Sequence, residues 1–343
     1  MKIGTLDLGK EPLLLAPMED VTDPSFRILC KEYGADMVYT EFVNSDGLVH
    51  GAGSSLQKLA IREEERPVGI QLYGQNIDSM VEGAKMIVEA KPDVLDLNFG
   101  CPVKKIAGRG AGAGMLRDIP KMLEMVAAIV RVSNVPVTVK TRLGWDETSI
   151  VIDTLAEQLQ DVGIAALTIH GRTRCQLYTG KADWEAIARV KSNPRLRIPI
   201  VGNGEITDGP GAAKAFREYG VDGVMIGRAS FGRPWVFSDV KHYLSAGTPP
   251  PPMDIAHRVE LARRHLALSL AVKGEKKGVL EMRRHLSCYF KGLPHFKAMR
   301  LALVTENDPV RLDGLIGEIG VKYAGWMPPT GDEAGGEAGG EGE

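Results

Sequence analysis

The segment VPVTVKTRLGWDETSIVIDTLAEQLQDVGIAALTIH, residues 135–170, carries the clearest secondary-structure pattern of this chain. It begins with an apolar run (135–140), continues through a helical pattern (148–163) and ends in a second apolar run (166–170). Two β-rich runs separated by a helix-length segment are typical of a βαβ unit with parallel strands. Both runs are nearly continuously apolar, which predicts strands that are buried on both faces of the sheet.

The same alternation recurs on both sides of this segment. The six further runs that we interpret as strands are LLLAPM (13–18), MVYTEF (37–42), VGIQLY (68–73), VLDLNF (94–99), IPIVGN (198–203) and GVMIGR (223–228). Eight strands alternating with helices over about 230 residues predict an α/β fold of the (β/α)₈ or TIM-barrel type. The alternative is a doubly wound open sheet, which usually has fewer strands and a glycine fingerprint after the first one. Here the first strand continues into PMEDVTD (17–23), which contains no glycine.

We expect the barrel to occupy residues 1–245 and to be followed by a small all-helical domain over 255–326. The segment SAGTPPPPMD (245–254) is rich in proline, so residues 246–254 are interpreted as a stiff linker. Residues 327–343 are rich in glycine and glutamate, and we expect this acidic tail to be disordered.

The formal net charge of −2 hides an uneven distribution. Residues 331–343 contain five acidic and no basic residues, so the rest of the chain carries a net charge of about +3. Residues 257–300 contain eleven Lys or Arg against three Glu. Local charge decides which partners a protein attracts, so the helical domain is a candidate nucleic-acid-binding surface. A merely solvated helix face is the alternative. Reversing several charges of the helical domain would distinguish these two interpretations. The arginines to be changed are Arg263, Arg264, Arg283 and Arg284.

The cysteine pattern argues against a metal site. No pair is spaced as CxxC among Cys30, Cys101, Cys175 and Cys288. The first residues are not apolar enough for a signal peptide, and no run of about 18 apolar residues could span a membrane. We therefore expect a monomeric cytoplasmic protein with free thiols, no metal and no membrane contact.

Reactive groups of such a barrel lie where the strands end at their carboxyl side. The candidates at these positions are Ala16, Pro17, Met18, Gln71, Asn98, Cys101, Lys140, Arg142, His170, Arg174, Asn203, Gly204, Glu205, Gly227 and Arg228. The glycines after strands seven and eight, with Arg228, suggest a phosphate-binding site of the kind these two loops often form. Ordinary turn glycines are the alternative. The glycine-rich GRGAGAG (108–114) misses the GxGxxG spacing and gives only a weak dinucleotide-binding signal.

Lys140 ends a buried strand, where an unpaired charge is costly. It must meet an anion or a polarised carbonyl, such as the N1–C2=O edge of a flavin, or else a rim carboxylate such as Asp96 or Glu41. Gln71 and Asn98 offer both donors and acceptors, which suits the edge of a ring with alternating N–H and C=O groups.

Cys101 lies in a Gly-Cys-Pro turn just past the fourth strand, near the mouth and among other polar candidates. A thiol there can act as nucleophile, base or proton donor, whereas a lone cysteine is more commonly inert and buried. The other three cysteines are interpreted as structural or incidental, although Cys175 lies on a rim loop. His170 suits a phosphate, a flavin edge, a substrate carbonyl or a structural role. Four further histidines are expected on helix surfaces: His257, His265, His285 and His295.

Together these residues resemble the tRNA-dihydrouridine synthases, most closely the bacterial B-type branch. The resemblance covers roughly residues 5–325. It rests on LLLAPMEDVTDPSFR (13–27), QLYG (71–74), DLNFGCPVKK (96–105), GAGML (112–116), VTVKTRLGWD (137–146), IHGRTRCQLYTGKADW (169–184), GNGEI (202–206), IGRASFGRPW (226–235) and RRHLSCYFKGLP (283–294).

The resemblance implies a barrel that binds FMN, takes electrons from NADPH or NADH, and reduces uridine in tRNA to dihydrouridine. It implies Cys101 as the acid that protonates C5 of the uracil after hydride addition at C6. The implied flavin-lining residues are Ala16, Pro17, Met18, Gln71, Lys140, His170, Asn203, Gly204, Glu205, Gly227 and Arg228. Asn98, Arg142 and Arg174 are implied to contact the substrate. The family usually has Asp where this chain has Glu205.

Two other functions compete with this one. A flavin barrel acting on a free pyrimidine, such as a dihydroorotate dehydrogenase, explains a flavin and the cysteine but not a basic helical domain. A non-catalytic RNA-binding module with a vestigial barrel predicts a colourless protein.

Overall fold

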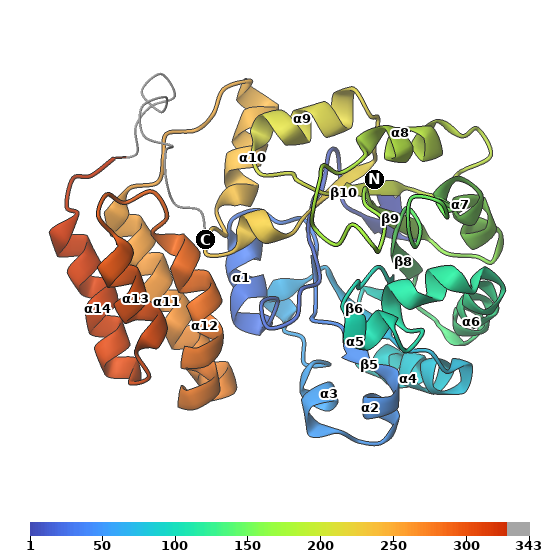
Figure 1. Ribbon diagram of the computed structural model, residues 1–343, viewed down its shortest axis with the longest axis horizontal. Coiled ribbons are helices and arrows are strands. Elements are labelled where there is room, and N and C mark those ends of the chain that lie inside the picture. The colour runs from blue at the N-terminus through green and yellow to red at the C-terminus, as the bar shows by residue number, and fades with distance from the viewer. Residues whose placement is uncertain (328–343) are drawn as a thin grey trace. The chain divides into compact units, whose positions relative to one another are not determined.

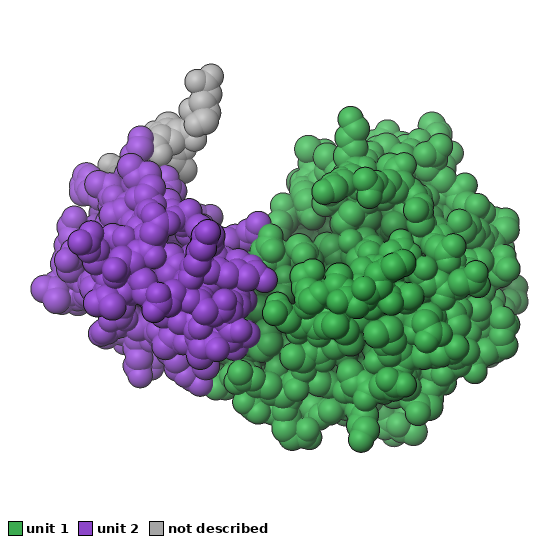
Figure 2. All heavy atoms as spheres, turned by 90° about the horizontal axis from the view of Figure 1, so that it is seen from below, with its two compact units in different colours: residues 1–230, 234–249 green, residues 231–233, 250–343 purple. Residues whose placement is uncertain are grey.

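The structure is a computed structural model that describes residues 1–327. The chain divides into two compact units, coloured separately in Figure 2. Of the described residues, the first unit consists of 1–230 and 234–249, and the second of 231–233 and 250–327. The division at 249/250 falls within the proline-rich segment. Except for Met327, the predicted acidic tail lies outside the described residues.

The first unit is built on eight parallel strands. They are β3 (Leu13–Leu15), β4 (Val38–Tyr39), β6 (Val68–Tyr73), β7 (Val94–Phe99), β8 (Val137–Arg142), β9 (Ala166–His170), β10 (Ile200–Asn203) and β11 (Gly223–Ile226). Each pairs with the next along the chain, and β11 pairs with β3. A parallel bridge between Leu14 and Met37 joins the first strand to the second and closes the cylinder. The short β5 (Val43–Asn44) also pairs with β6. The predicted TIM barrel is confirmed, and the open-sheet alternative is excluded.

Helices alternate with these strands and surround the barrel (Figure 1). They are α1 (Pro24–Glu32), α4 (Ile77–Glu89), α6 (Ile119–Val132), α7 (Ile152–Asp161), α8 (Trp184–Ser192), α9 (Gly209–Arg217) and α10 (Val236–Ala246). Several begin at an Asp or Asn whose side chain accepts hydrogen bonds from the first turn, for example Asp23 before α1 and Asp208 before α9. The helix predicted from residue 148 begins only at Ile152, because residues 146–149 form a turn around the Asp146 carboxylate.

Shorter helices lie in the loops that follow the strands, which is the side of a TIM barrel that carries function. After β5 come α2 (Ser45–Val49), α3 (Gly53–Gln57) and the 3₁₀ turn η1 (Glu63–Glu65). After β7 come α5 (Lys104–Ala107) and η2 (Gly112–Arg117), and after β11 comes η3 (Arg228–Ser230).

The side chains inside the barrel change from apolar to polar along the barrel axis. At the amino ends of the strands it is filled by buried apolar side chains, among them Leu14, Met37, Val94 and Val201. The hairpin of β1 (Lys2–Ile3) and β2 (Leu6–Asp7) adds Ile3 to this cluster and covers that end. Towards the carboxyl ends the buried residues become polar: Gln71, Asp96, Asn98, Thr138, Thr168, His170 and Asn203. The polar end of the interior positions the site.

The second unit is helical, as predicted. It contains α11 (Ile255–Lys273), α12 (Glu275–Tyr289), α13 (Lys297–Thr305) and α14 (Pro309–Lys322), with Leu266, Leu286 and Ile316 buried in its core. Within residues 1–327, no helix combines the length and the apolar character that a membrane span requires.

The prediction that all four of its histidines lie on helix surfaces is wrong for two of them. His265 and His285 are 1% and 2% exposed, and their rings lie 4.5 Å apart. Nδ1 of His265 lies 3.0 Å from the Tyr289 hydroxyl, and Nδ1 of His285 accepts a hydrogen bond from the backbone of Gly232. Periodicity alone did not show that both residues face the interior of the helical unit.

Candidate active site at the barrel mouth

The barrel brings the predicted site residues to one rim. Register pairs Asn98 with Lys140 across β7 and β8, and it pairs His170 with both Arg142 and Asn203. The first and last strands also meet there, since a Cβ added to Gly227 would lie 3.6 Å from both Ala16 and Met18. Residues that are more than 200 positions apart in sequence therefore line the same mouth.

Cys101 is held in place by the strand end that precedes it. Oδ1 of Asn98 accepts hydrogen bonds from the backbone nitrogens of Gly100, at 3.0 Å, and Cys101, at 2.9 Å. The Cys101 carbonyl accepts a hydrogen bond from Ala113, at the start of η2. A Cβ added to Gly112 would lie 3.1 Å from that of Cys101, so η2 packs closely behind the thiol.

Cys101 is 8% exposed. Burial raises the pKa of the thiol above its ordinary value, although the Val103 backbone and the nearby Arg142 and Lys140 act in the opposite direction. The sulfur is therefore protonated at neutral pH, which is the state that a proton donor requires.

A buried hydrogen-bond chain supports Asn98 from below. Nδ2 of Asn98 donates to Oε1 of Gln71 at 2.8 Å, and Nε2 of Gln71 donates to Asp96 at 2.6 Å. The second oxygen of Asp96 accepts from the Thr138 hydroxyl, also at 2.6 Å. Burial raises the pKa of Asp96 to about 6, against the opposing hydrogen bonds from Thr138 and Gln71. This chain links three neighbouring strands to the turn that carries the thiol.

Sequence reasoning did not assign Asp96 and Thr138 to the site. The signal was present, because Asp96 lies two residues before Asn98 and therefore on the same face of its strand. Its register partners across the sheet are Gln71 and Thr138.

Lys140 is a cation that forms no ion pair within the described residues, although the Asp96 carboxylate acts to raise its pKa. Neither carboxylate that was considered as its partner pairs with it: Asp96 is bound by Gln71 and Thr138, and Glu41 faces Lys58. Lys140 has no ion pair or hydrogen bond within the described part of the chain. Burial, and after it the neighbouring Arg142, lower the pKa of Lys140 to about 8. This lysine is therefore charged at neutral pH and available to an anionic group.

His170 adds a ring nitrogen without a partner to the same side of the mouth. It is 8% exposed, and its buried Nδ1 has no hydrogen-bond partner among residues 1–327. Burial lowers the pKa of His170 far below its ordinary value, and four cations lower it further: Arg142, Lys140, Arg172 and Arg228. The imidazole is therefore neutral, and the mouth around it is strongly electropositive.

Two arginines of the mouth lie against one tyrosine. The guanidinium carbon of Arg228 lies 4.4 Å from the Tyr178 ring centroid, and that of Arg142 lies 5.6 Å from it. Arg142 also donates to the carbonyls of Gly100, Thr173 and Leu177. Arg142 thus joins the loops after β7 and β9, and its substrate contact stays a prediction. Tyr178 was not predicted as a site residue.

The loop after β10 contains three residues that were predicted to line the flavin, and they make several contacts within the protein. Glu205 accepts hydrogen bonds from Arg172 at 2.6 Å and from the backbone of Ala182 at 2.8 Å. Gly204 has φ 133°, and an added Cβ would lie 2.7 Å from that of Ala182. Asn203 donates to the carbonyl of Met225 at 2.8 Å. Close packing within the protein therefore explains why glycine occupies position 204.

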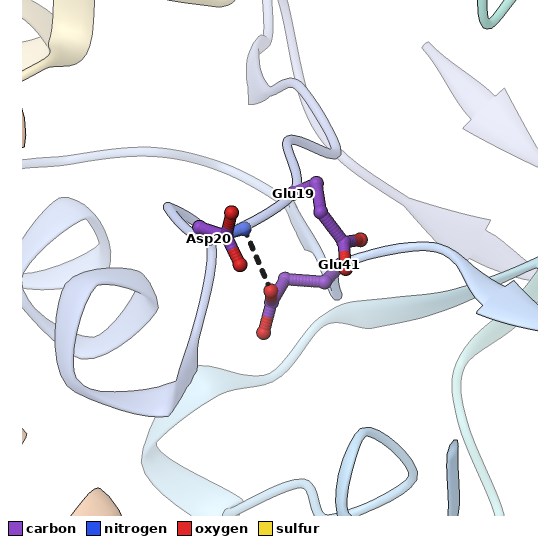
Figure 3. A group of neighbouring side chains, drawn as sticks. All are labelled: Glu19, Asp20 and Glu41. Carbon is purple, nitrogen blue, oxygen red and sulfur yellow. Dashed lines mark hydrogen bonds between the residues drawn. The ribbon is translucent and has the colours of Figure 1, made fainter. Parts of the chain in front are cut away.

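A group of three carboxylates lies at the first loop, but it is not a convincing metal site. Glu19, Asp20 and Glu41 lie side by side in Figure 3, and the backbone nitrogen of Asp20 donates to Glu41 at 2.8 Å. The Lys58 ammonium is hydrogen-bonded to Glu19 and lies 3.9 Å from Glu41. A lysine thus already provides the positive charge that a metal ion would supply.

Comparison with known proteins gives a consistent set of relatives. The sequence model of the family "Dihydrouridine synthase (Dus)" matches residues 14–314. The chain is 38% identical over 320 residues to "Probable tRNA-dihydrouridine synthase" of Rickettsia conorii, covering 93% of this chain and 96% of the relative. It is 39% identical over 309 residues to "tRNA-dihydrouridine synthase B" of Xanthomonas campestris, covering 90% and 92%.

Among solved structures, the chain is similar to the 2-naphthoyl-CoA reductase–2-naphthoyl-CoA complex, with a TM-score of 0.57 and 11% identity over 71% of this chain and 51% of that chain. Histamine dehydrogenase from Rhizobium sp. 4-9 gives a TM-score of 0.51 and 12% identity over 78% of this chain and 50% of that chain. At such low identity these similarities concern the fold alone.

Proposed function

The chain belongs to the dihydrouridine synthase family, and from this premise we propose that it is an FMN-dependent enzyme that uses NADPH to reduce the C5=C6 bond of uridine in tRNA. NADH is the alternative reductant. The free thiols fit a reducing cytoplasm, and we propose that the enzyme acts there as a monomer. The observation that carries the proposal is the position of the protonated Cys101 thiol beside unpaired cations at the mouth of a TIM barrel.

The residues at the mouth fit a flavin. Lys140 is a cation without an ion pair or hydrogen bond, and His170 has a buried ring nitrogen without a hydrogen-bond partner, both within residues 1–327. A flavin offers an electron-rich N1–C2=O edge to Lys140. The phosphate of FMN would bind the Arg228 guanidinium. The other residues proposed to line it are Ala16, Pro17, Met18, Gln71, Asn203, Gly204, Glu205 and Gly227. When bound, the flavin would supply the hydride that is added to C6 of the uracil.

The protein's own contribution to the reaction is the proton. The uracil double bond is conjugated to the C4 carbonyl, so hydride addition at C6 leaves an enolate that must be protonated at C5. Cys101 is a competent donor, because its raised pKa keeps the proton on sulfur until that charge develops. Backbone hydrogen bonds to Asn98 fix the turn that carries the donor.

The substrate must present a single base to this mouth. A base that is stacked in tRNA has to be turned out of its stack before C5 can reach Cys101. We propose that Asn98, Arg142 and Arg174 contact the extruded nucleotide. Asn98 can still donate one hydrogen bond from its side-chain amide, because Oδ1 and the other N–H already have partners. The basic helices of the second unit are proposed to bind tRNA phosphates.

The test is to incubate the purified protein with NADPH and a tRNA transcript that lacks modified bases, and to measure dihydrouridine by mass spectrometry. We expect a yellow protein that forms dihydrouridine in tRNA and does not oxidise free dihydroorotate. Activity on dihydroorotate alone would favour the free-pyrimidine dehydrogenase instead. A colourless protein that binds tRNA without reaction would favour the non-catalytic module.

A further inference from the structure

Trp145 carries two arginines on its ring. The guanidinium carbon of Arg117 lies 5.0 Å from the indole centroid, and that of Arg174 lies 4.7 Å from it. Trp145 follows β8, Arg117 ends η2 and Arg174 follows β9, so three loops of the rim meet here. We call these three residues the Arg–Trp–Arg stack. Since each guanidinium lies about 5 Å from one ring, the two cations lie within about 10 Å of each other.

The charges of the stack are not neutralised. The carboxylates next in sequence point elsewhere: Asp118 accepts from the backbone of Lys121, and Asp146 accepts from Thr148 and Ser149. Neither Arg117 nor Arg174 forms an ion pair with any described residue. Other arginines of this unit do have carboxylate partners, for example Arg66 with Asp93 and Arg195 with Glu157. The stack therefore concentrates unpaired positive charge at one place on the rim.

The stack is a built feature rather than a chance encounter of surface side chains. Backbone hydrogen bonds of 2.9 Å tie Arg174 to Gly144 and Cys175 to Trp145, which locks the loops after β8 and β9 together. Nε of Arg174 is buried and has no hydrogen-bond partner within residues 1–327. An arginine supported by an indole keeps its N–H groups oriented for a ligand at a low entropic cost.

The position of the stack relates it to the reaction. Arg117 ends the same 3₁₀ segment that begins with Gly112 and Ala113, the residues that pack behind Cys101. Arg117 is exposed, whereas Lys140 and His170 lie deeper in the mouth. An extruded nucleotide remains attached on both sides to a backbone that must run over the outer loops. Planar guanidiniums match phosphate oxygens in geometry and charge.

We propose that the Arg–Trp–Arg stack binds phosphodiester groups of the substrate RNA beside the target uridine. The proposal rests on the proposed function and adds to it a binding site on the barrel itself, separate from the basic helices. With two guanidiniums over its ring, the indole serves as a support for the cations rather than as a platform for a base. A phosphate of the nicotinamide nucleotide is the other ligand with this chemistry, and the experiment separates the two.

The experiment compares flavin-loaded Arg117→Ala, Arg174→Ala and Trp145→Leu with the unchanged enzyme and with Arg131→Ala. Arg131 is a matched control because it is exposed, lacks an ion pair among the described residues and lies in the last turn of α6, at the opposite end of the barrel. Binding of unmodified tRNA is measured from low to high salt. The rate of flavin reduction is measured against NADPH concentration without RNA.

We expect Arg117→Ala and Arg174→Ala each to weaken tRNA binding roughly five- to eightfold at 0.1 M salt and to lower the slope of log K against log salt by about 0.7–0.9. Trp145→Leu should lower the slope as well, and Arg131→Ala should not. Arg117→Ala, Trp145→Leu and Arg131→Ala should retain the flavin and the dependence of its reduction on NADPH.

Two results would overturn the proposal. One is tRNA binding by Arg117→Ala and Arg174→Ala that matches Arg131→Ala at every salt concentration. The other is unchanged RNA binding with a higher half-saturating NADPH concentration, which would assign the stack to the nicotinamide nucleotide. A failure of the unchanged enzyme to form dihydrouridine would instead reject the proposed function, so the two failures are distinguishable.

Discussion

Oδ1 of Asn98 lies 2.9 Å from the backbone nitrogen of Cys101 and accepts its hydrogen bond. The other end of the same amide donates to Gln71. One side chain therefore connects the buried polar interior of the barrel to the turn that carries the reactive thiol. In this arrangement Asn98 positions the proton donor, whatever further contact it makes with the substrate.

Asn98→Ala should lower the single-turnover rate of dihydrouridine formation by about 100-fold, because a misplacement of about 1 Å costs this much when a reacting group must be aligned. Asn98→Asp keeps an acceptor for the Cys101 amide and should recover part of the rate. Alkylation of Cys101 relative to the exposed Cys175 reports the position of the thiol independently of substrate. An unaltered alkylation ratio in Asn98→Ala would contradict a positioning role.

Cys101→Ala should retain the flavin spectrum and its reduction by NADPH but lose dihydrouridine formation by a factor of about 10²–10⁴, the usual contribution of a positioned general acid. The flavin contacts proposed above involve other residues, which is why binding should survive. Single-turnover reaction of the reduced enzyme with tRNA measures the loss. Full activity of this variant would remove Cys101 from the mechanism.

Lys140 predicts a pH dependence of flavin binding. Burial lowers its pKa to about 8, so in the flavin-free protein the ammonium is charged below that pH and neutral above it. If the charge holds the flavin, affinity should fall as pH rises through about 8, with little change below pH 7. Lys140→Met should bind flavin more weakly and show no such fall. Titrating flavin fluorescence at several pH values tests both expectations.

Asp96 predicts a pH dependence of stability. Burial raises its pKa from an ordinary carboxyl value to about 6 in the folded state, so the folded protein binds this proton more tightly than the unfolded chain does. The group's contribution to stability is therefore fully present below about pH 4 and is lost as pH rises through about 6. The loss is on the order of 3 kcal/mol.

Asp96→Asn isolates this contribution, since Glu41 and Glu65 have pKa values raised in the same direction and remain in the variant. Denaturant unfolding at about pH 4 and 7 should show a smaller loss of stability for the variant than for the unchanged protein. Equal losses for both proteins would show that Asp96 does not titrate in this range.

The fold was predictable because its signals are local. Each buried strand is a short apolar run such as VLDLNF, and each lies one helix-length from the next. The element ends were less predictable: the strand expected at 37–42 is only Val38–Tyr39, followed by a separate β5. Hydrogen bonds to a neighbouring strand set such boundaries, and these bonds cannot be inferred from a run of apolar residues.

The candidate site was predictable where the strand-end rule applies, as for Lys140 and His170. It was not predictable where loops meet in space. Trp145 and Tyr178 acquire their roles from arginines of other loops, a pairing that no sequence spacing expresses. Glu205 is the opposite case: it was predicted to line the flavin, whereas in the structure its carboxylate contacts Arg172 and Ala182.

The helical unit leads to a final prediction, about which of its basic residues bind RNA. Arg263 is one of the four arginines considered above for nucleic-acid binding, but its guanidinium makes a two-point contact with Asp313. Arg300 is exposed and has no ion pair within the described residues. A guanidinium that already chelates a carboxylate has its best-aligned donors occupied, so it is a poorer phosphate ligand than a free one.

Arg300→Ala should therefore lower the salt slope of tRNA binding by about 0.7–0.9, whereas Arg263→Ala should change it much less. Because the Arg263–Asp313 pair is half exposed, its loss should cost less than about 1 kcal/mol of stability and leave the helical unit folded. Circular dichroism checks this before the binding is measured. Equal slopes for both variants would mean that the helices attract RNA through their overall charge rather than through individual contacts, and a slope lowered only in Arg263→Ala would mean that RNA displaces Asp313 from its partner.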